Sequence, residues 1–175
     1  MKTKFLLTLM VTMGLFIASC ENDDDDQPTP GLSQTDINYL NQYTQANLAQ
    51  LSLSQLALDS GTNSNFSAYT QAGLTQYRNA QLSLDSIAQQ YSLTLPTTPD
   101  TASINFRNTL AASGRGRSFD SLYVANQLVA LDNYLISLNN GTSQITDSRL
   151  RSYIDQQRPL IQQQRINTDS LRLRL

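Results

Sequence analysis

The stretch FDSLYVANQLVALDNYLISLNNG, residues 119–141, decides the fold of this chain of 175 residues. Its apolar side chains recur at steps of three and four, and the repeating members are Val124, Leu128, Leu131, Leu135 and Leu138. Such steps place side chains on one face of an α-helix, because the helix makes about 3.6 residues per turn. The stretch therefore predicts a long amphipathic helix. Asn140-Gly141 predicts its end, since glycine commonly follows the last helical turn.

Two earlier segments show the same helical spacing. The first begins at Ser33, where Asp36 three residues later predicts a capping box, and it ends at about Ser60, before Gly61. Its stripe consists of Ile37, Leu40, Thr44, Leu48, Leu51 and Leu58. The second ends before Leu95-Pro96 and carries on one face Phe66, Tyr69, Gly73, Tyr77, Ala80, Leu84, Ile87 and Tyr91. Both segments are expected to be long helices with one buried face.

The last segment has a less regular helical pattern. It is expected to run from about Thr142 to Leu173, with an inward apolar set of Leu150, Ile154, Ile161 and Leu171. Pro159 lies inside it and is expected to kink the helix or to start a new one. The same inner face also carries Gln157, Gln164 and Thr168. We therefore expect this face either to be hydrated or to bind a ligand.

The pattern as a whole predicts an all-α fold. A shorter helix is expected over residues 101–112, ahead of the break SGRGRS at 113–118, and no long alternating run predicts strands. Each apolar stripe needs a partner, and short connections favour antiparallel neighbours. We therefore expect residues 33–175 to form an up-down antiparallel four-helix bundle with a short extra helix before the third long helix.

The N-terminus predicts a lipid anchor. Two lysines precede the uncharged apolar run 5–17, which is typical of a secretory signal peptide over residues 1–19 and too short to cross a bilayer. The tetrad Ile17-Ala18-Ser19-Cys20 resembles the bacterial lipobox, in which cleavage falls between Ser19 and Cys20 and the cysteine receives diacylglycerol and acyl chains such as palmitate. Several chains make a durable anchor, whereas one binds a membrane reversibly. The alternative is an unmodified cysteine after an ordinary signal peptide.

Residues 20–32 are expected to form an acidic tether. The stretch ENDDDDQPTPG at 21–31 combines like charges with two prolines, so it repels itself and stays extended. Acidic residues directly after a lipidated cysteine resemble the signal that sends Bacteroidetes lipoproteins to the outer face of the outer membrane. The alternative is a plain linker. We therefore expect an outer-membrane lipoprotein, with exposure at the cell surface favoured over a periplasmic position.

The composition argues against most catalytic sites. The chain has no histidine, its single glutamate is Glu21, and its two lysines precede Cys20. Di-iron bundles use glutamate and Glu-x-x-His ligands, and nucleophilic catalysis needs a base beside the nucleophile. The body from Gly31 carries 10 basic and 9 acidic residues, without the basic excess of a nucleic-acid-binding protein. We expect no enzymatic activity, no cofactor beyond the lipid on Cys20, and no nucleic-acid partner.

Tyrosines and aspartates recur along the expected helices. The tyrosines are expected to fill the core with hydroxyls paired at its boundary, or alternatively to form a platform for carbohydrate or aromatic ligands; they are Tyr43, Tyr69, Tyr77, Tyr91, Tyr123, Tyr134 and Tyr153. The aspartates are expected to cap helices, lie exposed or pair with arginines such as Arg158; they are Asp36, Asp59, Asp85, Asp120, Asp132, Asp155 and Asp169.

The ordered segments resemble a known family. The stretches NLAQLSLSQLAL at 47–58, YSLTLP at 91–96, FDSLYVANQLV at 119–129 and QRPLIQQQ at 157–164 are similar, in order and spacing, to the ferritin-like outer-membrane proteins of domain of unknown function 4142 (DUF4142). The resemblance implies a ferritin-like four-helix bundle, usually secreted or lipid-anchored. It also implies inward acidic and histidine positions that suggest a metal site.

The metal positions implied by the resemblance have lost their usual ligands in this chain. They fall on Gln50, Tyr77, Leu131 and Gln164. The favoured hypothesis is therefore a lipid-anchored envelope protein with a non-enzymatic structural or binding role, whose partner is another envelope protein or a glycan. The alternatives are a ferritin-like metal-binding or redox protein with unrecognised ligands, and a small-ligand or glycan-binding surface lipoprotein. The sequence predicts no particular oligomeric state.

Overall fold

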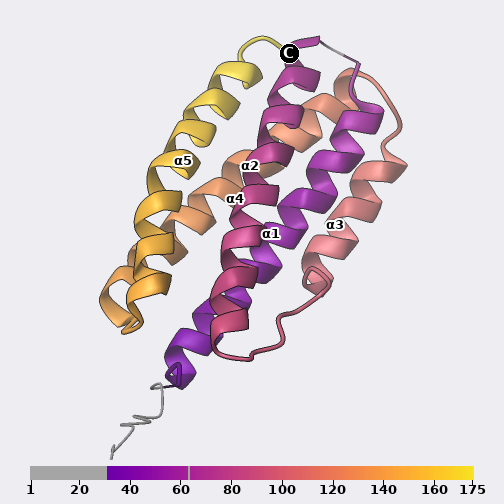
Figure 1. Cartoon of the computed structure of the whole chain (residues 1–175). Coiled ribbons are helices and arrows are strands. Elements are labelled where there is room, and N and C mark those ends of the chain that lie inside the picture. The colour runs from indigo at the N-terminus through magenta and orange to yellow at the C-terminus, as the bar shows by residue number, and fades with distance from the viewer. Residues whose placement is uncertain (1–30, 63) are drawn as a thin grey trace, which may run out of the picture. The chain divides into compact units, whose positions relative to one another are not determined.

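The computed structural model describes residues 31–62 and 64–175 as a helical domain (Figure 1). Its helices are α1 (Gln34–Ser60), α2 (Ser64–Gln90), α3 (Thr101–Ala112), α4 (Arg117–Gln144) and α5 (Ser148–Arg172). The predicted all-α class is confirmed, with four long antiparallel helices and the short α3 before α4. The predicted signal peptide and lipid site, including Ser19 and Cys20, lie outside the described residues.

Contacts at the two ends of the bundle define its topology. At one end, the Asp36 carboxylate of α1 accepts hydrogen bonds from Thr146, which connects α4 to α5. At the other end, Thr62 after α1 hydrogen-bonds to Asp120 in the first turns of α4. Consequently α2 and α4 run in the same direction, and residues 91–116, which contain α3, cross the length of the bundle between them (Figure 1).

The four long helices form two hairpins. Helix α1 packs most extensively on α2, and α4 packs most extensively on α5, whereas α1 and α4 meet over a smaller area. Helix α3 lies against both α1 and α4. We call the strip between residues 42–50 of α1 and 130–137 of α4 the α1–α4 seam. Helices α1 and α4 pack less extensively at this seam than α2 and α5 do at the other junction between the two hairpins. Helix α3 borders the seam.

Two hydrophobic clusters hold the helices together. One contains Leu40, Leu84 and Leu150 with their neighbours, and it lies toward the start of α1. The other contains Phe66, Phe119 and Tyr123, whose rings pack edge to face at centroid separations of 6.3 and 5.2 Å from Phe66. Full burial of each such side chain stabilises the fold by about 1.5–3 kcal/mol.

The helix boundaries agree with the sequence except around α4 and α5. Ser33 and Asp36 form the predicted capping box, Gly61 caps the end of α1, and α3 has the predicted limits. The prediction that α4 stops at Asn140-Gly141 is wrong, because α4 continues to Gln144. A Cβ on Gly141 would lie 2.2 Å from the Tyr43 hydroxyl, so the glycine permits close approach of α1 and does not end the helix.

The last helix is therefore shorter than predicted. It begins at Ser148, with Asp147 as its N-cap, and the expected start at Thr142 is wrong. It also continues unbroken across Pro159, so no new helix begins there. The inward positions predicted for it are confirmed: Leu150, Ile154, Ile161 and Leu171 are buried.

The predicted apolar stripes of α1 and α4 are confirmed in part, because Leu40 and Thr44 of α1 and Val124, Leu131 and Leu138 of α4 are buried. Leu48, Leu51 and Leu58 of α1 are only half-buried, whereas its core face includes Asn47, Gln50 and Ser54. In α4, Leu128 and Leu135 are half-buried, and Gln127 and Tyr134 are buried. A search for apolar spacing misses Asn47, Gln50, Ser54 and Gln127 because these buried side chains are polar.

Most aspartates have the predicted roles. Asp132, Asp155 and Asp169 pair with Arg165, Arg158 and Arg172, at N–O distances of 2.9, 3.5 and 2.7 Å. Asp120 departs from all three expected roles. It is 2% exposed, its Oδ1 atom has no hydrogen-bond partner, and burial raises the pKa of its carboxyl despite hydrogen bonds from Thr62.

Candidate functional site

The four positions suggested by the family resemblance are all buried. Gln50 and Gln164 are 6% exposed, Tyr77 is 1% exposed and Leu131 is fully covered. The structure joins two of them directly, because the Tyr77 hydroxyl donates a hydrogen bond of 2.8 Å to Gln164 Oε1. Leu131 belongs to the hydrophobic cluster around Tyr77, and Gln50 borders the α1–α4 seam.

These residues do not fit a transition-metal site. Leu131 offers no donor atom, and the Gln164 Oε1 atom already accepts a hydrogen bond from the Tyr77 hydroxyl. Burial raises the pKa of Tyr77 well above its ordinary value, so this phenol stays a neutral donor. Among the described residues, no group of three His, Cys, Asp or Glu side chains is placed to hold a metal ion. Hard and borderline cations prefer carboxylate and imidazole ligands, which these positions do not supply.

The polar face of α5 is paired within the bundle. Gln164 accepts a hydrogen bond from the Tyr77 hydroxyl, and the hydroxyls of Thr168 and Tyr69 lie 2.6 Å apart. A Cβ on Gly73 would lie 3.1 Å from the Gln164 amide nitrogen, so α2 and α5 approach closely here. The interpretation of this face as hydrated or ligand-binding is therefore wrong for Gln164 and Thr168. Their partners are tyrosines of α2, which no pattern within α5 reveals.

Five of the seven tyrosines fill the core, as predicted, whereas Tyr69 and Tyr91 are half-buried. Several of the buried hydroxyls pair in the interior and not at its boundary. The Tyr134 and Tyr153 hydroxyls lie 2.7 Å apart between α4 and α5. The Tyr43 hydroxyl donates to the backbone oxygen of Ser137 at 3.2 Å. Burial raises the pKa of Tyr134 to about 12, so its hydroxyl remains protonated at physiological pH.

Several buried polar atoms of α1 and α4 have no protein partner. They include the side-chain oxygens of Asn47 and Gln50, both amide atoms of Gln127, and the Ser137 hydroxyl oxygen. A buried donor or acceptor left unpaired costs about 1–3 kcal/mol. Such atoms need an explanation, such as local strain, a functional role, or a bound water or ion. Gln50 and Ser137 both line the same pocket.

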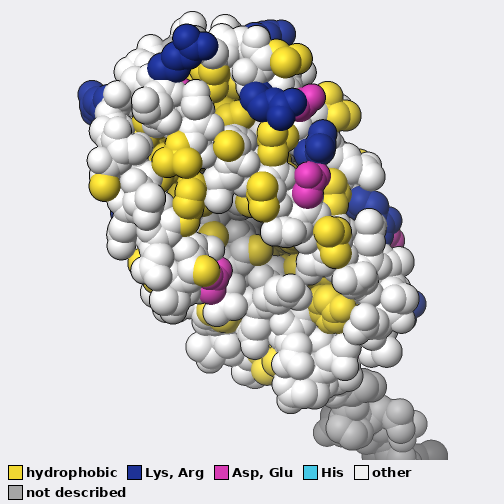
Figure 2. All heavy atoms as spheres, turned by 180° about the vertical axis from the view of Figure 1, so that it is seen from behind, with side chains coloured by type: hydrophobic (Ala, Val, Ile, Leu, Met, Phe, Trp, Pro, Cys, Tyr) yellow, Lys and Arg dark blue, Asp and Glu magenta, His cyan; other side chains and the backbone are white. Residues whose placement is uncertain are grey.

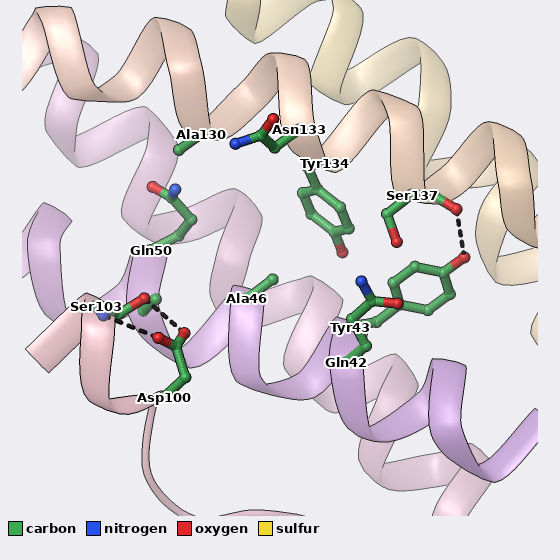
Figure 3. Close-up of a pocket in the computed structure, with 11 residues that line it drawn as sticks. Gln42, Tyr43, Ala46, Gln50, Asp100, Ser103, Ala130, Asn133, Tyr134 and Ser137 are labelled. Carbon is green, nitrogen blue, oxygen red and sulfur yellow. Dashed lines mark hydrogen bonds between the residues drawn. The ribbon is translucent and has the colours of Figure 1, made fainter.

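This pocket lies at the α1–α4 seam and has a volume of about 260 Å³. Its walls are α1, the start of α3 and α4 (Figure 3). Ala46, Ala49 and Ala130 supply small side chains where larger ones would close the space. We call this space the seam pocket; its remaining lining residues are Gln42, Tyr43, Gln50, Asp100, Ser103, Asn133, Tyr134 and Ser137.

The polar groups gather at two ends of the seam pocket. Figure 3 shows Gln50, Ser103 and Asp100 at one end, and Tyr43, Tyr134 and Ser137 at the other. The rings of Tyr43 and Tyr134 have centroids 6.0 Å apart, and their hydroxyls are already paired. These rings therefore offer mainly apolar faces, whereas Gln50 Oε1 and Ser137 Oγ offer free hydrogen-bonding capacity.

Asp100 is the one charged residue that lines the seam pocket. It caps α3, because its carboxylate accepts hydrogen bonds from the Ser103 backbone nitrogen at 2.9 Å and from the Ser103 hydroxyl at 2.7 Å. These hydrogen bonds hold the pKa of Asp100 below its usual value. The carboxylate is therefore ionised at neutral pH, and it retains lone pairs for further hydrogen bonds.

Comparison with known families identifies the chain. The model of the family described as domain of unknown function (DUF4142) matches residues 22–171. The chain belongs to the DUF4142 family. The predicted resemblance is thus confirmed at the level of the family.

One solved structure shows the fold of this DUF4142 chain in another protein. It is the crystal structure of a DUF305 fragment from Deinococcus radiodurans, similar with a TM-score of 0.74 and 6% sequence identity. The match covers 83% of this chain and 100% of that chain. At this identity the likeness concerns the fold alone. No curated protein matches the chain.

The seam pocket contains three residues for which the sequence suggests a site in this DUF4142 chain: Gln50, and Tyr43 and Tyr134 of the alternative tyrosine platform. Gln50 was predicted as a degenerate metal position, and it lines the pocket instead. Asp100, Ser103 and Ser137 were not predicted as site residues. Asp100 directly precedes the predicted short helix, which gives a signal for a helix cap but not for a pocket.

Proposed function

We propose that this DUF4142 protein is a lipid-anchored envelope protein whose helical domain binds a small molecule and performs no catalysis. The observation that carries the binding role is the seam pocket, in which buried Gln50 Oε1 and Ser137 Oγ lack protein partners. Ligand sites are typically concave, with a mainly apolar lining and a few placed polar groups. Alanines and tyrosine rings beside these two side chains have that character.

The anchor follows from the residues before the domain. Ile17-Ala18-Ser19-Cys20 supports cleavage before Cys20 and attachment of diacylglycerol and acyl chains to its sulfur. The acidic residues that follow support a Bacteroidetes-type lipoprotein of the outer membrane, displayed at the cell surface. None of the described helices is long and apolar enough to cross a membrane. In this proposal, the acyl chains alone hold the domain at the membrane.

We also propose that the domain has ferritin-like architecture with altered chemistry. Ferritin-like bundles contain one long crossover connection, and residues 91–116 form such a connection between α2 and α4. The amide, phenol and aliphatic side chains at Gln50, Tyr77, Leu131 and Gln164 favour a binding role over metal chemistry. The partner we expect is a component of the envelope.

Two measurements test the proposal. Mass spectrometry of the protein purified from membranes is expected to find an acylated N-terminal Cys20, and a Cys20→Ala variant is expected to leave the membrane fraction. A thermal-shift screen of the full-length protein against sugars, amines, organic acids and lipids is expected to find a stabilising compound. Ligand at about 100 times its Kd stabilises a protein by about 2.7 kcal/mol. An unmodified cysteine would refute the anchor, and a screen without a stabilising compound would refute the binding role.

A further inference from the structure

We propose that the seam pocket binds a neutral, polyhydroxylated ligand of single-ring size, such as one sugar residue of an envelope glycan. This inference rests on the proposed binding function and specifies its ligand. Four features of the seam pocket support this ligand: its hydrogen-bonding groups, its charge, its volume and its apolar walls.

The polar groups of the seam pocket match hydroxyl groups. The amides of Gln42, Gln50 and Asn133 each present donors and an acceptor, and the Ser137 hydroxyl does both as well. The Ser103 hydroxyl already donates its proton to Asp100, so it offers a ligand only an acceptor. A sugar hydroxyl also donates and accepts, so it satisfies either kind of atom. Gln50 is more than nine-tenths buried and its Oε1 has no protein partner, which gives a bound hydroxyl a defined place to donate.

The charge of the seam pocket disfavours anions. Among the described residues that line it, none is an arginine, and the one charged group is the Asp100 carboxylate. Phosphates and carboxylates would meet a like charge there without a cation to pair with them. On the rear face of the molecule, Figure 2 shows mainly hydrophobic and neutral polar side chains, with few acidic side chains and with the arginines mostly in the upper half.

A neutral ligand also suits the state of Asp100. Its carboxylate already accepts two hydrogen bonds from Ser103, which use part of its hydrogen-bonding capacity. Its remaining lone pairs can accept a hydrogen bond from a ligand hydroxyl. An ammonium group would compete for the same carboxylate. The amides and alanines that fill the rest of the pocket give such a cation no second negative partner.

The volume limits the ligand to one ring. At about 260 Å³, the seam pocket falls just below the range of about 300–1,000 Å³ that is typical of pockets for drug-sized ligands. The rings of Tyr43 and Tyr134 and the methyl groups of Ala46 and Ala130 form its apolar walls (Figure 3). Sugar rings carry C–H faces that pack against such walls while their hydroxyls reach the polar ends.

Calorimetric titration of the full-length, detergent-solubilised protein tests the inference. The probes are N-acetylglucosamine and galactose as neutral ligands, glucosamine as an amine, and glucuronate as an anion. We expect a neutral probe to bind at least tenfold more tightly than glucosamine or glucuronate. Gln50→Leu and Ser137→Ala are each expected to weaken that binding at least tenfold. The control Gln71→Leu changes an exposed glutamine of α2 outside the pocket and is expected to leave binding unchanged.

The outcomes separate the inference from the function on which it rests. Tightest binding of glucosamine or glucuronate, weakened by Ser137→Ala, would overturn the neutral-ligand inference and keep the seam pocket as a binding site. Binding that neither pocket variant weakens, although both melt like the unaltered protein, would overturn the assignment to this pocket. Failure of all four probes, with stabilisation by another class in the thermal screen, would overturn only the sugar-like ligand. Failure of every compound would overturn the proposed function as well.

Discussion

Replacement of Gly141 by alanine tests the packing of α1 against α4. In an unconstrained helix, glycine to alanine stabilises by about 1 kcal/mol. Here the new Cβ would lie 2.2 Å from the Tyr43 hydroxyl and 3.0 Å from the terminal methyl groups of Ile145 and Ile154. Overpacking of this kind costs about 1–3 kcal/mol. We therefore expect Gly141→Ala to lower the free energy of unfolding by up to about 2 kcal/mol, because the overpacking outweighs the helical gain.

The cause of this loss is testable by a double-mutant cycle. Tyr43→Phe removes the atom in closest contact with the new Cβ, together with a hydrogen bond to the Ser137 backbone that contributes about 1 kcal/mol. In the Tyr43→Phe background, Gly141→Ala is expected to cost at least about 1 kcal/mol less than in the unaltered protein.

Urea denaturation followed by circular dichroism measures both free energies of unfolding. Asn139→Ala, at an exposed position of the same helix, serves as the control and is expected to have little effect. A gain in stability from Gly141→Ala, like that seen in an isolated helix, would refute the close approach. An equal loss in both backgrounds would refute the role of the Tyr43 hydroxyl.

Three further predictions concern buried polar groups. Tyr77→Phe removes the donor to Gln164 and is expected to lower the free energy of unfolding by about 1–3 kcal/mol, whereas Tyr39→Phe, on the same bundle but half-buried, is expected to have a smaller effect in the same urea assay. Burial raises the pKa of Asp36, but hydrogen bonds from Ser33, Thr146 and Asp147 outweigh it and lower the net pKa, so its contribution is complete above the unfolded value of 3.8 and is lost as pH falls below that value. The stability difference between the unaltered protein and Asp36→Asn is therefore expected to shrink below about pH 4 in acid titrations followed by circular dichroism. Burial raises the pKa of Asp120, because it disfavours the ionised carboxylate in the folded protein. Asp120→Asn is therefore expected to raise the free energy of unfolding at pH 7 and to lose this advantage as pH falls toward 3.8. A variant that is less stable than the unaltered protein at pH 7 would contradict this prediction.

Local signals in the sequence predict most of the helices. Ser33 and Asp36 lie three residues apart, so the capping box is visible without knowledge of any other helix. The limits of α3 are similarly local, since Asp100 and Ser113 lie at its ends. Apolar spacing also places Leu150, Ile154 and Ile161 correctly, because a buried apolar face repeats within the helix itself.

The errors arise where a distant residue decides the outcome. Gly141 looks like a helix stop, but Tyr43 of α1 requires a residue without a Cβ at that place. Gln127 is buried although it is polar, and Leu128 beside it is only half-buried. The seam pocket combines Gln50 of α1, the α3 cap Asp100 and Ser137 of α4, so no spacing within one segment of the sequence predicts it.

The most direct test of the seam pocket is nuclear magnetic resonance of the isotope-labelled protein during titration with the neutral sugar that binds most tightly. We expect shifts of backbone amide signals concentrated at Ala46, Gln50, Ala130 and Ser137, whereas the signals of Gln164 and Thr168 on α5 are expected to stay unmoved. Shifts centred on α5, or none in the seam at saturating sugar, would contradict this expectation.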